Sequence, residues 1–283
     1  MKNKTTYKNT YKNKNHFSFG ENWKDFLSTL NNERINQAKK SLINFLGGTK
    51  NIKGKSFVDI GCGSGLFSLA AYLLGASKIV SVDIDDSSIW CANSLKEKYA
   101  NKNNWSVIKG SALDINFLKS LGKFDIVYSW GVLHHTGNMY QAIINVSKIV
   151  KPGKIFYLAI YNESTSFWQG GSSKFWLKIK KLYNSSTKFQ KSLILKIYMT
   201  YQIASLILIS RTNPISFIRN YKKKRGMSWK HDLIDWLGGY PYEFALSDEL
   251  INFMGNDKFL CKKMKFRNGT GCNEFIFKNL NKK

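Results

Sequence analysis

Cysteine and proline are scarce in this 283-residue chain, which has four of the first and three of the second. The cysteines form no CxxC pair and have no histidine at metal-ligand spacing, which argues against a disulfide framework and against a zinc site. Scattered cysteines suit a reducing compartment, so we predict a cytoplasmic protein without a metal. The four are Cys62, Cys91, Cys261 and Cys272.

The beginning of the chain lacks the apolar stretch that a secretion signal needs. Residues 1–16 are instead rich in Lys, Asn and Thr, and we predict a disordered basic tail there. From residue 20 to residue 46, apolar side chains recur at helical spacing until Gly47 and Gly48 stop the pattern. Residues 17–54 are therefore predicted to form an N-terminal helical segment.

Acidic residues are absent from residues 164–231, which carry 14 Lys and Arg and no Asp or Glu. The formal net charge of the whole chain is +26, so this stretch carries more than half of the excess positive charge. Two interpretations stay open: a codon bias towards Lys and Asn, and a functional basic surface. Such a surface could face an anionic membrane, a phosphorylated substrate or nucleic acid.

Strand-length apolar runs alternate with helix-length segments between residues 55 and 163. This alternation predicts an α/β fold with a doubly wound, mostly parallel sheet, which binds ligands at the carboxyl ends of its strands. The predicted strands are 56–60, 78–82, 105–108, 124–128 and 155–161, and the predicted helices are 65–74, 87–99 and 139–150. Residues 241–283 are predicted to add a helix at 247–253 and two strands, near 260–266 and 272–277.

A glycine-rich loop follows the first predicted strand, with glycines at Gly61, Gly63 and Gly65. Glycines permit a tight turn and a close approach of backbone to ligand, and the N-terminus of the next helix offers free N–H donors. The spacing argues against a dinucleotide fingerprint, because Leu66 stands where that motif needs its third glycine. The loop also lacks the GK[ST] of a phosphate-binding P-loop. A plain strand–helix turn is the alternative.

Polar side chains follow the next two predicted strands. Asp83 ends the second, 24 residues after Asp59, where a carboxylate can accept hydrogen bonds from both ribose hydroxyls of a nucleoside. Ser111 and Asp114 follow the third, where a polar side chain could meet an adenine amino group. Asp114 could equally cap the helix predicted after it.

Two adjacent histidines, His134 and His135, follow the fourth predicted strand. Histidine titrates near neutrality, so either side chain could accept a proton from a substrate hydroxyl. The alternative is that they only hydrogen-bond the backbone or line the pocket. We therefore name both as candidate catalytic bases without choosing between them.

Together these motifs resemble those of the class I, Rossmann-like S-adenosylmethionine-dependent methyltransferases, particularly the small-molecule branch that includes the quinone O-methylases. Residues 57–162 carry the match, and the two closing strands resemble the family's terminal β-hairpin. The resemblance implies a seven-stranded, mostly parallel sheet with S-adenosylmethionine as its cofactor. Quinone methylases commonly have an acid where this chain has His134 and His135, so the resemblance does not carry over the acceptor.

The resemblance also implies positions for the cofactor. The glycines would surround its methionine part with Asp59 at the amino end, Asp83 would bind the ribose, and Ile84 would pack on adenine. The implied cofactor-binding residues are Asp59, Gly61, Cys62, Gly63, Gly65, Asp83, Ile84, Ser111, Ala112, Asp114 and Trp130. The candidate acceptor-binding residues are Trp23, Tyr161, Asn162, Tyr240 and Tyr242.

Residues 164–240 remain as an insertion before the last helix, which we call the cap and predict to be helical, basic and aromatic. Within the cap, residues 192–210 are nearly all apolar. A buried cap helix, a helix lying in a membrane interface and a membrane-spanning helix all stay open. Residues 222–225 add a cluster of four cations that could meet anionic lipid head groups.

We predict an enzyme that methylates a hydroxyl oxygen of a small, lipid-linked or sugar-like acceptor. Its predicted location is cytoplasmic, with a peripheral position at the inner face of the membrane as a further possibility. An RNA methyltransferase, binding transfer or ribosomal RNA through the basic cap, is one alternative, although the chain has no recognised nucleic-acid-binding module. A non-catalytic protein that binds membrane or RNA on a methyltransferase scaffold is the other.

Overall fold

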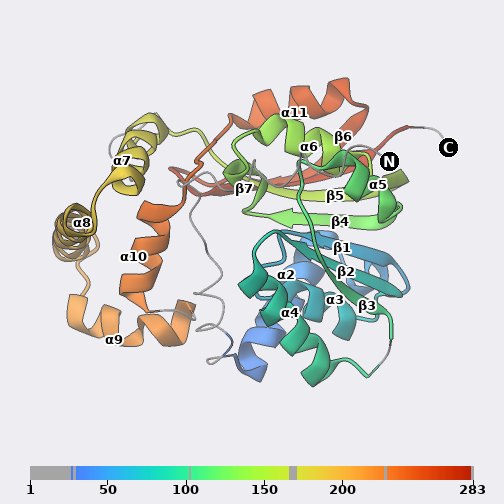
Figure 1. Cartoon of the computed structure of the whole chain (residues 1–283), viewed down its shortest axis with the longest axis horizontal. Coiled ribbons are helices and arrows are strands. Elements are labelled where there is room, and N and C mark those ends of the chain that lie inside the picture. Colours follow the sequence, from blue (N-terminus) through green and yellow to red (C-terminus); the bar gives the residue numbers. More distant parts are fainter. Residues whose placement is uncertain (1–26, 28–29, 102, 166–170, 226–227, 282–283) are drawn as a thin grey trace, which may run out of the picture.

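The computed structural model describes residues 27, 30–101, 103–165, 171–225 and 228–281. In these residues seven strands form one sheet in the order β3-β2-β1-β4-β5-β7-β6 (Figure 1). The strands are β1 (Ser56–Ile60), β2 (Lys78–Asp83), β3 (Trp105–Lys109), β4 (Phe124–Trp130), β5 (Val150–Tyr161), β6 (Phe259–Lys265) and β7 (Cys272–Asn279). The predicted doubly wound, seven-stranded α/β fold is confirmed.

The central strands are parallel and β7 is antiparallel, as the resemblance implied. Strand β1 pairs in parallel with both β2 and β4, while β7 pairs antiparallel with β5 and β6. All five residues of β1 are buried, which is the pattern of a central strand covered on both faces. The carboxyl ends of β1, β2 and β4 therefore lie along one edge of the sheet, where the predicted motifs follow them.

Helices cover the two faces of the sheet and create two hydrophobic cores (Figure 1). Successive strand residues point to opposite faces, so Phe57 joins one core and Val58 the other. On the Phe57 side lie α2 (Asn32–Leu46), α3 (Leu66–Leu73) and α4 (Asp86–Tyr99), and on the Val58 side lie α5 (Ile115–Ser120), α6 (Met139–Ser147) and α11 (Ser247–Asn256).

Two predicted elements have different bounds in the structure. The helix predicted from residue 20 to residue 46 is not continuous, because Asn31 is extended and its side chain accepts a hydrogen bond from the Arg34 amide at 3.0 Å. An N-cap of this kind starts a new helix, so α2 begins only at Asn32. Strand β5 begins at Val150 rather than near residue 155, since Val150 already pairs with Phe124 of β4.

Four helices occupy most of the predicted cap and lie beside the sheet (Figure 1). They are α7 (Ser173–Ser185), α8 (Lys188–Leu208), α9 (Pro214–Arg225) and α10 (Trp229–Gly238). They share a third hydrophobic cluster, whose buried members are Trp176, Tyr183, Leu195, Trp229, Leu233, Leu237 and Tyr242. No helix in the described part of the chain is long and apolar enough to cross a membrane, so the spanning interpretation of residues 192–210 is wrong.

Candidate cofactor and catalytic site

The glycine loop adopts a conformation that other residues would not tolerate. Gly61, Gly63 and Gly65 have φ angles of 75°, 52° and 79°, in the left-handed region that favours glycine. A Cβ atom on Gly61 would lie 2.3 Å from the Val132 side chain, and one on Gly65 would lie 2.9 Å from the Cα of Ala92. The loop therefore needs glycine both for its backbone angles and for its close packing.

Asp83 lies beside the glycine loop and is hydrogen-bonded to it. Its Oδ2 accepts from the Gly63 amide at 2.9 Å, and its Oδ1 accepts from the Asp85 amide at 3.0 Å. Burial raises the pKa of Asp83, and these amide hydrogen bonds act in the opposite direction. Each carboxylate oxygen keeps a second lone pair for a ligand. The two motifs that the sequence separates by about twenty residues thus form one structural unit.

Asp59 is buried beneath the loop and belongs to an internal hydrogen-bond chain. Its Oδ2 accepts from the Ser68 hydroxyl at 2.7 Å, Ser68 accepts from Ser81 at 2.6 Å, and Ser81 accepts from the Trp105 indole at 2.8 Å. Burial raises the pKa of Asp59 to about 7, although the Ser68 hydrogen bond lowers it. These contacts attach β1 to α3 and β2. The role of Asp59 at the amino end of a cofactor stays a prediction.

Two large apolar side chains are exposed at the same edge of the sheet. Ile84 follows β2 and is 47% exposed, and Trp130 ends β4 and is 42% exposed. Apolar surface at the carboxyl ends of parallel strands is where a planar adenine could pack. Cys62, within the loop, is buried.

The segment after β3 is occupied by local capping contacts. Asp114 accepts from the amides of Asn116 and Phe117 through one oxygen, each at 3.0 Å, and so caps α5. Ser111 accepts from the Leu113 amide at 3.1 Å, and Ala112 is buried. The capping alternative for Asp114 is therefore observed, while contacts of this segment with adenine stay a prediction.

The two histidines lie on the short 3₁₀ helix η2 (Leu133–His135) and have different environments. His134 is fully buried, and its Nδ1 accepts from the Tyr161 amide at 3.3 Å. Burial, with smaller contributions from His135 and Lys180, lowers the pKa of His134 well below its usual value. His134 is therefore neutral, with its proton on Nε2, which has no hydrogen-bond partner among the described residues.

His135 is only partly buried, and its Nδ1 lies 2.6 Å from the carbonyl oxygen of Pro241. A carbonyl oxygen only accepts, so Nδ1 must carry the proton and donate. Neutral His135 consequently has its lone pair on Nε2. This orientation, with one ring nitrogen fixed by a carbonyl, is the one a general base needs.

Of the candidate acceptor-binding residues, Tyr161 lies against the histidines and Tyr242 lies against Tyr161. The Tyr161 ring lies 3.9 Å from the His134 ring and 5.1 Å from the Tyr242 ring. Asn162 is buried and used internally, since it donates to the Gly269 carbonyl and accepts from Asn273, both at 3.0 Å.

The roles of the remaining two candidate acceptor-binding residues stay predictions. Tyr240 directly precedes Pro241. Trp23 lies outside the described residues, as do the whole predicted basic tail and the N-terminal segment up to residue 26.

Lys180 is a residue of this cluster that the sequence interpretation missed. It is fully buried on α7, donates to the Trp236 carbonyl, and its Nζ lies 4.1 Å from the Trp236 ring and 4.8 Å from the Tyr242 ring. Burial lowers the pKa of Lys180 to about 7, against the attraction of Asp235. Lys180 is four residues from Trp176 and three from Tyr183, and this spacing, which puts it on the same helix face as the two aromatics, is the signal that could have found it.

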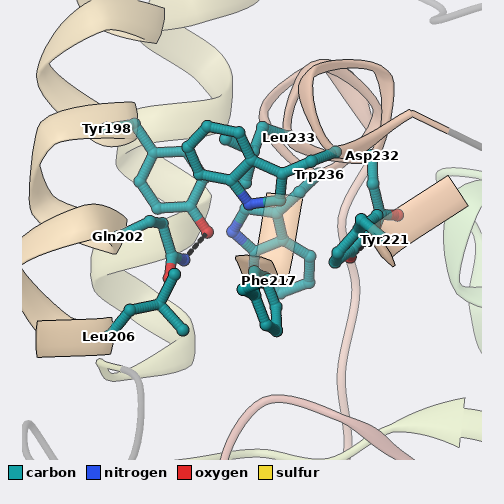
Figure 2. Close-up of a pocket in the computed structure, with 9 residues that line it drawn as sticks. Tyr198, Gln202, Leu206, Phe217, Tyr221, Asp232, Leu233 and Trp236 are labelled. Atoms are coloured by element: carbon teal, nitrogen blue, oxygen red, sulfur yellow. Dashed lines mark hydrogen bonds between the residues drawn. The ribbon is translucent and has the colours of Figure 1, made fainter. Parts of the chain in front are cut away.

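A pocket of about 260 Å³ lies between helices α8, α9 and α10 of the cap (Figure 2). Its walls are mainly aromatic, with one carboxylate, Asp232, which accepts from the Tyr221 hydroxyl. The Trp236 indole N–H is buried and has no hydrogen-bond partner in the described part of the chain. The Trp236 ring also lies 5.9 Å from Tyr161, so one side chain connects the pocket with the histidine cluster.

Within the described residues, no three His, Cys, Asp or Glu side chains are grouped closely enough to hold an ion.

Comparison with known proteins identifies the family. A family model described as a methyltransferase domain matches residues 51–215, more than half of the chain. The mitochondrial ubiquinone biosynthesis O-methyltransferase of Dictyostelium discoideum is 32% identical over 120 residues, which are 40% of this chain and 37% of that protein. The ubiquinone biosynthesis O-methyltransferase of Pelagibacter ubique is 29% identical over 141 residues, 49% of this chain and 56% of that protein. The chain thus matches about a third to just over half of these relatives' lengths.

A solved structure supports the fold. PKMT2 from Rickettsia typhi in complex with AdoHcy has a TM-score of 0.56 and 15% identity, covering 86% of this chain and 52% of that one. The glycine loop, the adjoining Asp83 and the matching family model lead to one conclusion. The chain belongs to the class I S-adenosylmethionine-dependent methyltransferases, an enzyme family whose cofactor is S-adenosylmethionine.

Proposed function

We propose that this chain methylates a hydroxyl oxygen of a small, lipid-linked acceptor, with S-adenosylmethionine as methyl donor. The observation that carries the proposal is the hydrogen bond between Asp83 and Gly63, which joins the ribose-binding acid to the glycine loop in one cofactor-binding unit. The histidine cluster lies at the same end of the sheet, after β4, where the acceptor would meet the donor.

The residues present fit this cofactor. Asp83 would accept hydrogen bonds from both ribose hydroxyls through its remaining lone pairs, and Ile84 would pack on the adenine. Gly61, Gly63 and Gly65 would let the backbone approach the methionine part, and Trp130 would lie beside the cofactor. Asp59, which is held by Ser68 of α3, would orient the amino end.

The bound cofactor supplies an electrophilic methyl carbon on a sulfonium sulfur. The protein's task is to align the acceptor oxygen with that carbon and to remove the hydroxyl proton. We propose that Nε2 of His135 accepts the proton that leaves the acceptor hydroxyl. The Pro241 carbonyl fixes the other ring nitrogen, Nδ1, as a hydrogen-bond donor, so the lone pair is on Nε2. His134 stays neutral and presents its Nε2–H as a hydrogen-bond donor within the cluster.

The cap supplies the acceptor site in this proposal. The pocket of Figure 2, of about 260 Å³, is lined by five aromatic side chains, and Trp236 connects it through Tyr161 to His134. The similarity to ubiquinone biosynthesis O-methyltransferases agrees with O-methylation of a lipid-like molecule. Because this chain has His134 and His135 where the quinone methylases commonly have an acid, we do not assign it their quinone acceptor.

RNA methylation is the second candidate, and the acid-free stretch at residues 164–231 favours it. RNA binding of that kind would weaken steeply with salt, because cations released from the phosphates drive it. Binding that is indifferent to salt would reject this candidate.

The proposal is tested by identifying the methylated product. The protein is incubated with methyl-labelled S-adenosylmethionine and with separate small-molecule, lipid and RNA fractions, and the label is located by mass spectrometry. We expect label on a hydroxyl oxygen in the lipid fraction, and roughly 100-fold slower turnover in His135→Gln with unchanged cofactor affinity. His231→Gln, a histidine of α10 outside η2, serves as the control. Label in RNA, or full activity in His135→Gln, would contradict the proposal.

A further inference from the structure

Helix α8 exposes a continuous apolar face. Phe189, Leu193, Ile197 and Tyr201 follow one another at four-residue spacing, so their side chains lie along one side of the helix. They are between 50% and 80% exposed, and Leu208, near the end of the same face, is 77% exposed. Only Leu195 on the opposite side is fully buried. We call this row, with Ile207 and Leu208, the α8 face.

Exposed lysines occur on α8 itself and on the preceding helix α7, and neither helix contains an acid. Lys174, Lys178 and Lys181 of α7 and Lys188 and Lys196 of α8 are exposed. Residues 164–231 contain no Asp or Glu, and the first acid after them, Asp232 of α10, lines the pocket between α8, α9 and α10. Large apolar side chains bordered by lysines are the composition of helices that lie in the interface of a membrane.

We propose that the α8 face docks on an anionic lipid bilayer, with α8 lying parallel to the membrane plane and its apolar row below the head groups. This surface is separate from the cofactor site, so the proposal does not depend on methyl transfer. The two parts of the surface have distinct roles: the lysines attract the anionic head groups, and the apolar row partitions below them. Neither part crosses the bilayer, in agreement with the absence of a spanning helix among the described residues.

Charge favours a bilayer over a second copy of the chain. Two α8 faces meeting each other would bring two acid-free, cationic segments together, and like charges would oppose the contact. Nucleic acid fits the lysines but matches less of the α8 face than a bilayer does. Four of its six residues, Leu193, Ile197, Ile207 and Leu208, are aliphatic and offer no ring for base stacking, and only Phe189 and Tyr201 carry rings. An anionic bilayer matches both the charge and the apolar surface.

Co-sedimentation of the full chain with lipid vesicles tests the apolar part of the proposal. Vesicles contain phosphatidylcholine alone or phosphatidylcholine with phosphatidylglycerol. We expect binding to the anionic vesicles, and about tenfold or more weaker partitioning for the double variant Leu193→Ser/Ile197→Ser. The matched control is Leu260→Ser/Leu280→Ser, two similarly exposed leucines of the β6 strand and the C-terminal region, away from α8 (Figure 1). Thermal melts of both variants confirm that they fold.

Charge reversal tests the second part. Lys178→Glu/Lys188→Glu should weaken binding to anionic vesicles several-fold at low salt and little at high salt, because screening removes the attraction. Lys40→Glu/Lys50→Glu, on α2 and the turn after it, should leave binding unchanged. Wild-type protein that stays wholly in the supernatant would overturn the proposal. A concentration-dependent dimer that the Leu193/Ile197 variant abolishes would also overturn it, in favour of a second copy.

Discussion

The sheet domain and the cap differ in what constrains their residues. In the sheet domain, both faces of β1 are covered, and residues 55–163 carry nearly balanced charge, with 11 Lys and Arg against 8 Asp and Glu. In the cap, α8 has one fully buried residue out of 21, and the charge is of one sign up to residue 231. In the sheet domain, backbone angles and burial on both faces restrict which residues are possible. In the cap, most side chains of α8 are at the surface, so contacts with solvent or with a partner restrict them instead. The sheet domain therefore identifies the methyl donor, whereas the acceptor and the membrane contact that we assign to the cap are proposals.

Gly61→Ala should have the largest effect, and it should be confined to the sheet domain. The new Cβ would lie 2.3 Å from Val132 at a φ of 75°, so the loop must shift away from the position that we propose for cofactor binding. We expect at least a 100-fold loss of S-adenosylmethionine affinity, measured by calorimetry, and a destabilisation of roughly 2 kcal/mol or more.

Gly122→Ala is the matched control for Gly61→Ala. Gly122 has a similar φ of 83°, but a Cβ there meets nothing within 4 Å. It should cost only about 1 kcal/mol of backbone strain and leave cofactor affinity unchanged. Equal losses of affinity in the two variants would show that general instability, and not the loop, is responsible.

Asp59→Asn should change how the stability of the sheet domain depends on pH. Because burial raises the folded-state pKa of Asp59 to about 7, the folded protein binds the extra proton between about pH 4 and pH 7. The wild type therefore loses stability relative to the variant as pH rises through this window, by on the order of 3 kcal/mol. Urea unfolding at pH 4.5 and pH 8 measures the difference.

Asp125→Asn should show the opposite sign. Burial alone would raise the pKa of Asp125. Hydrogen bonds from Ser56 and the Lys151 ammonium outweigh this effect and hold the pKa well below its usual value. The ionised Asp125 carboxylate stabilises the folded protein at neutral pH, and this stabilisation is lost in acid. The variant should therefore be less stable than the wild type at pH 7 and approach wild-type stability as the pH falls below 4. The same sign for both variants would contradict the assigned environments.

Lys180→Met should act on the cap and the adjoining histidine cluster, and not on the cofactor site. The folded-state pKa of Lys180 is lowered to about 7, so the unfolded chain binds more protons above that pH and wild-type stability rises towards pH 9. The variant should lack this rise, which amounts to about 2 kcal/mol. Cofactor affinity should be unchanged, and a loss of affinity would break the separation of the two regions.

Trp236→Phe should have the smallest effect on stability and should weaken acceptor binding. Removing an indole N–H that is buried without a partner offsets part of the lost packing, so we expect a change within about 1 kcal/mol. We also expect a several-fold higher KM for the acceptor, measured with the cofactor saturating, at the same cofactor affinity. An unchanged KM would remove the pocket of Figure 2 from the acceptor site.

The two regions also differ in how far the sequence predicts them. The parallel strands were predictable because buried runs such as β1 have a distinctive composition, and the glycine positions because no other residue fits their backbone angles. The burial of Lys180 between Trp236 and Tyr242 was not predictable, because it depends on three segments meeting in the fold. The break at Asn31 was missed because the apolar spacing continues across it.

The histidines were predictable only in part. Their position after β4 followed from the motif, whereas their different roles depend on Pro241 and Tyr161, which are distant in sequence. Contacts of this kind are set by tertiary structure and leave no local pattern to read.

Calorimetric titration of S-adenosylmethionine into the wild type and into Asp83→Ala tests the central claim most directly. Asp86→Ala, an exposed acid on the adjacent helix, is the control. The account predicts binding by the wild type and by Asp86→Ala, and at least tenfold weaker binding by Asp83→Ala, because two charge-assisted hydrogen bonds to the ribose are lost. No binding by the folded wild type, or unchanged affinity in Asp83→Ala, would contradict it.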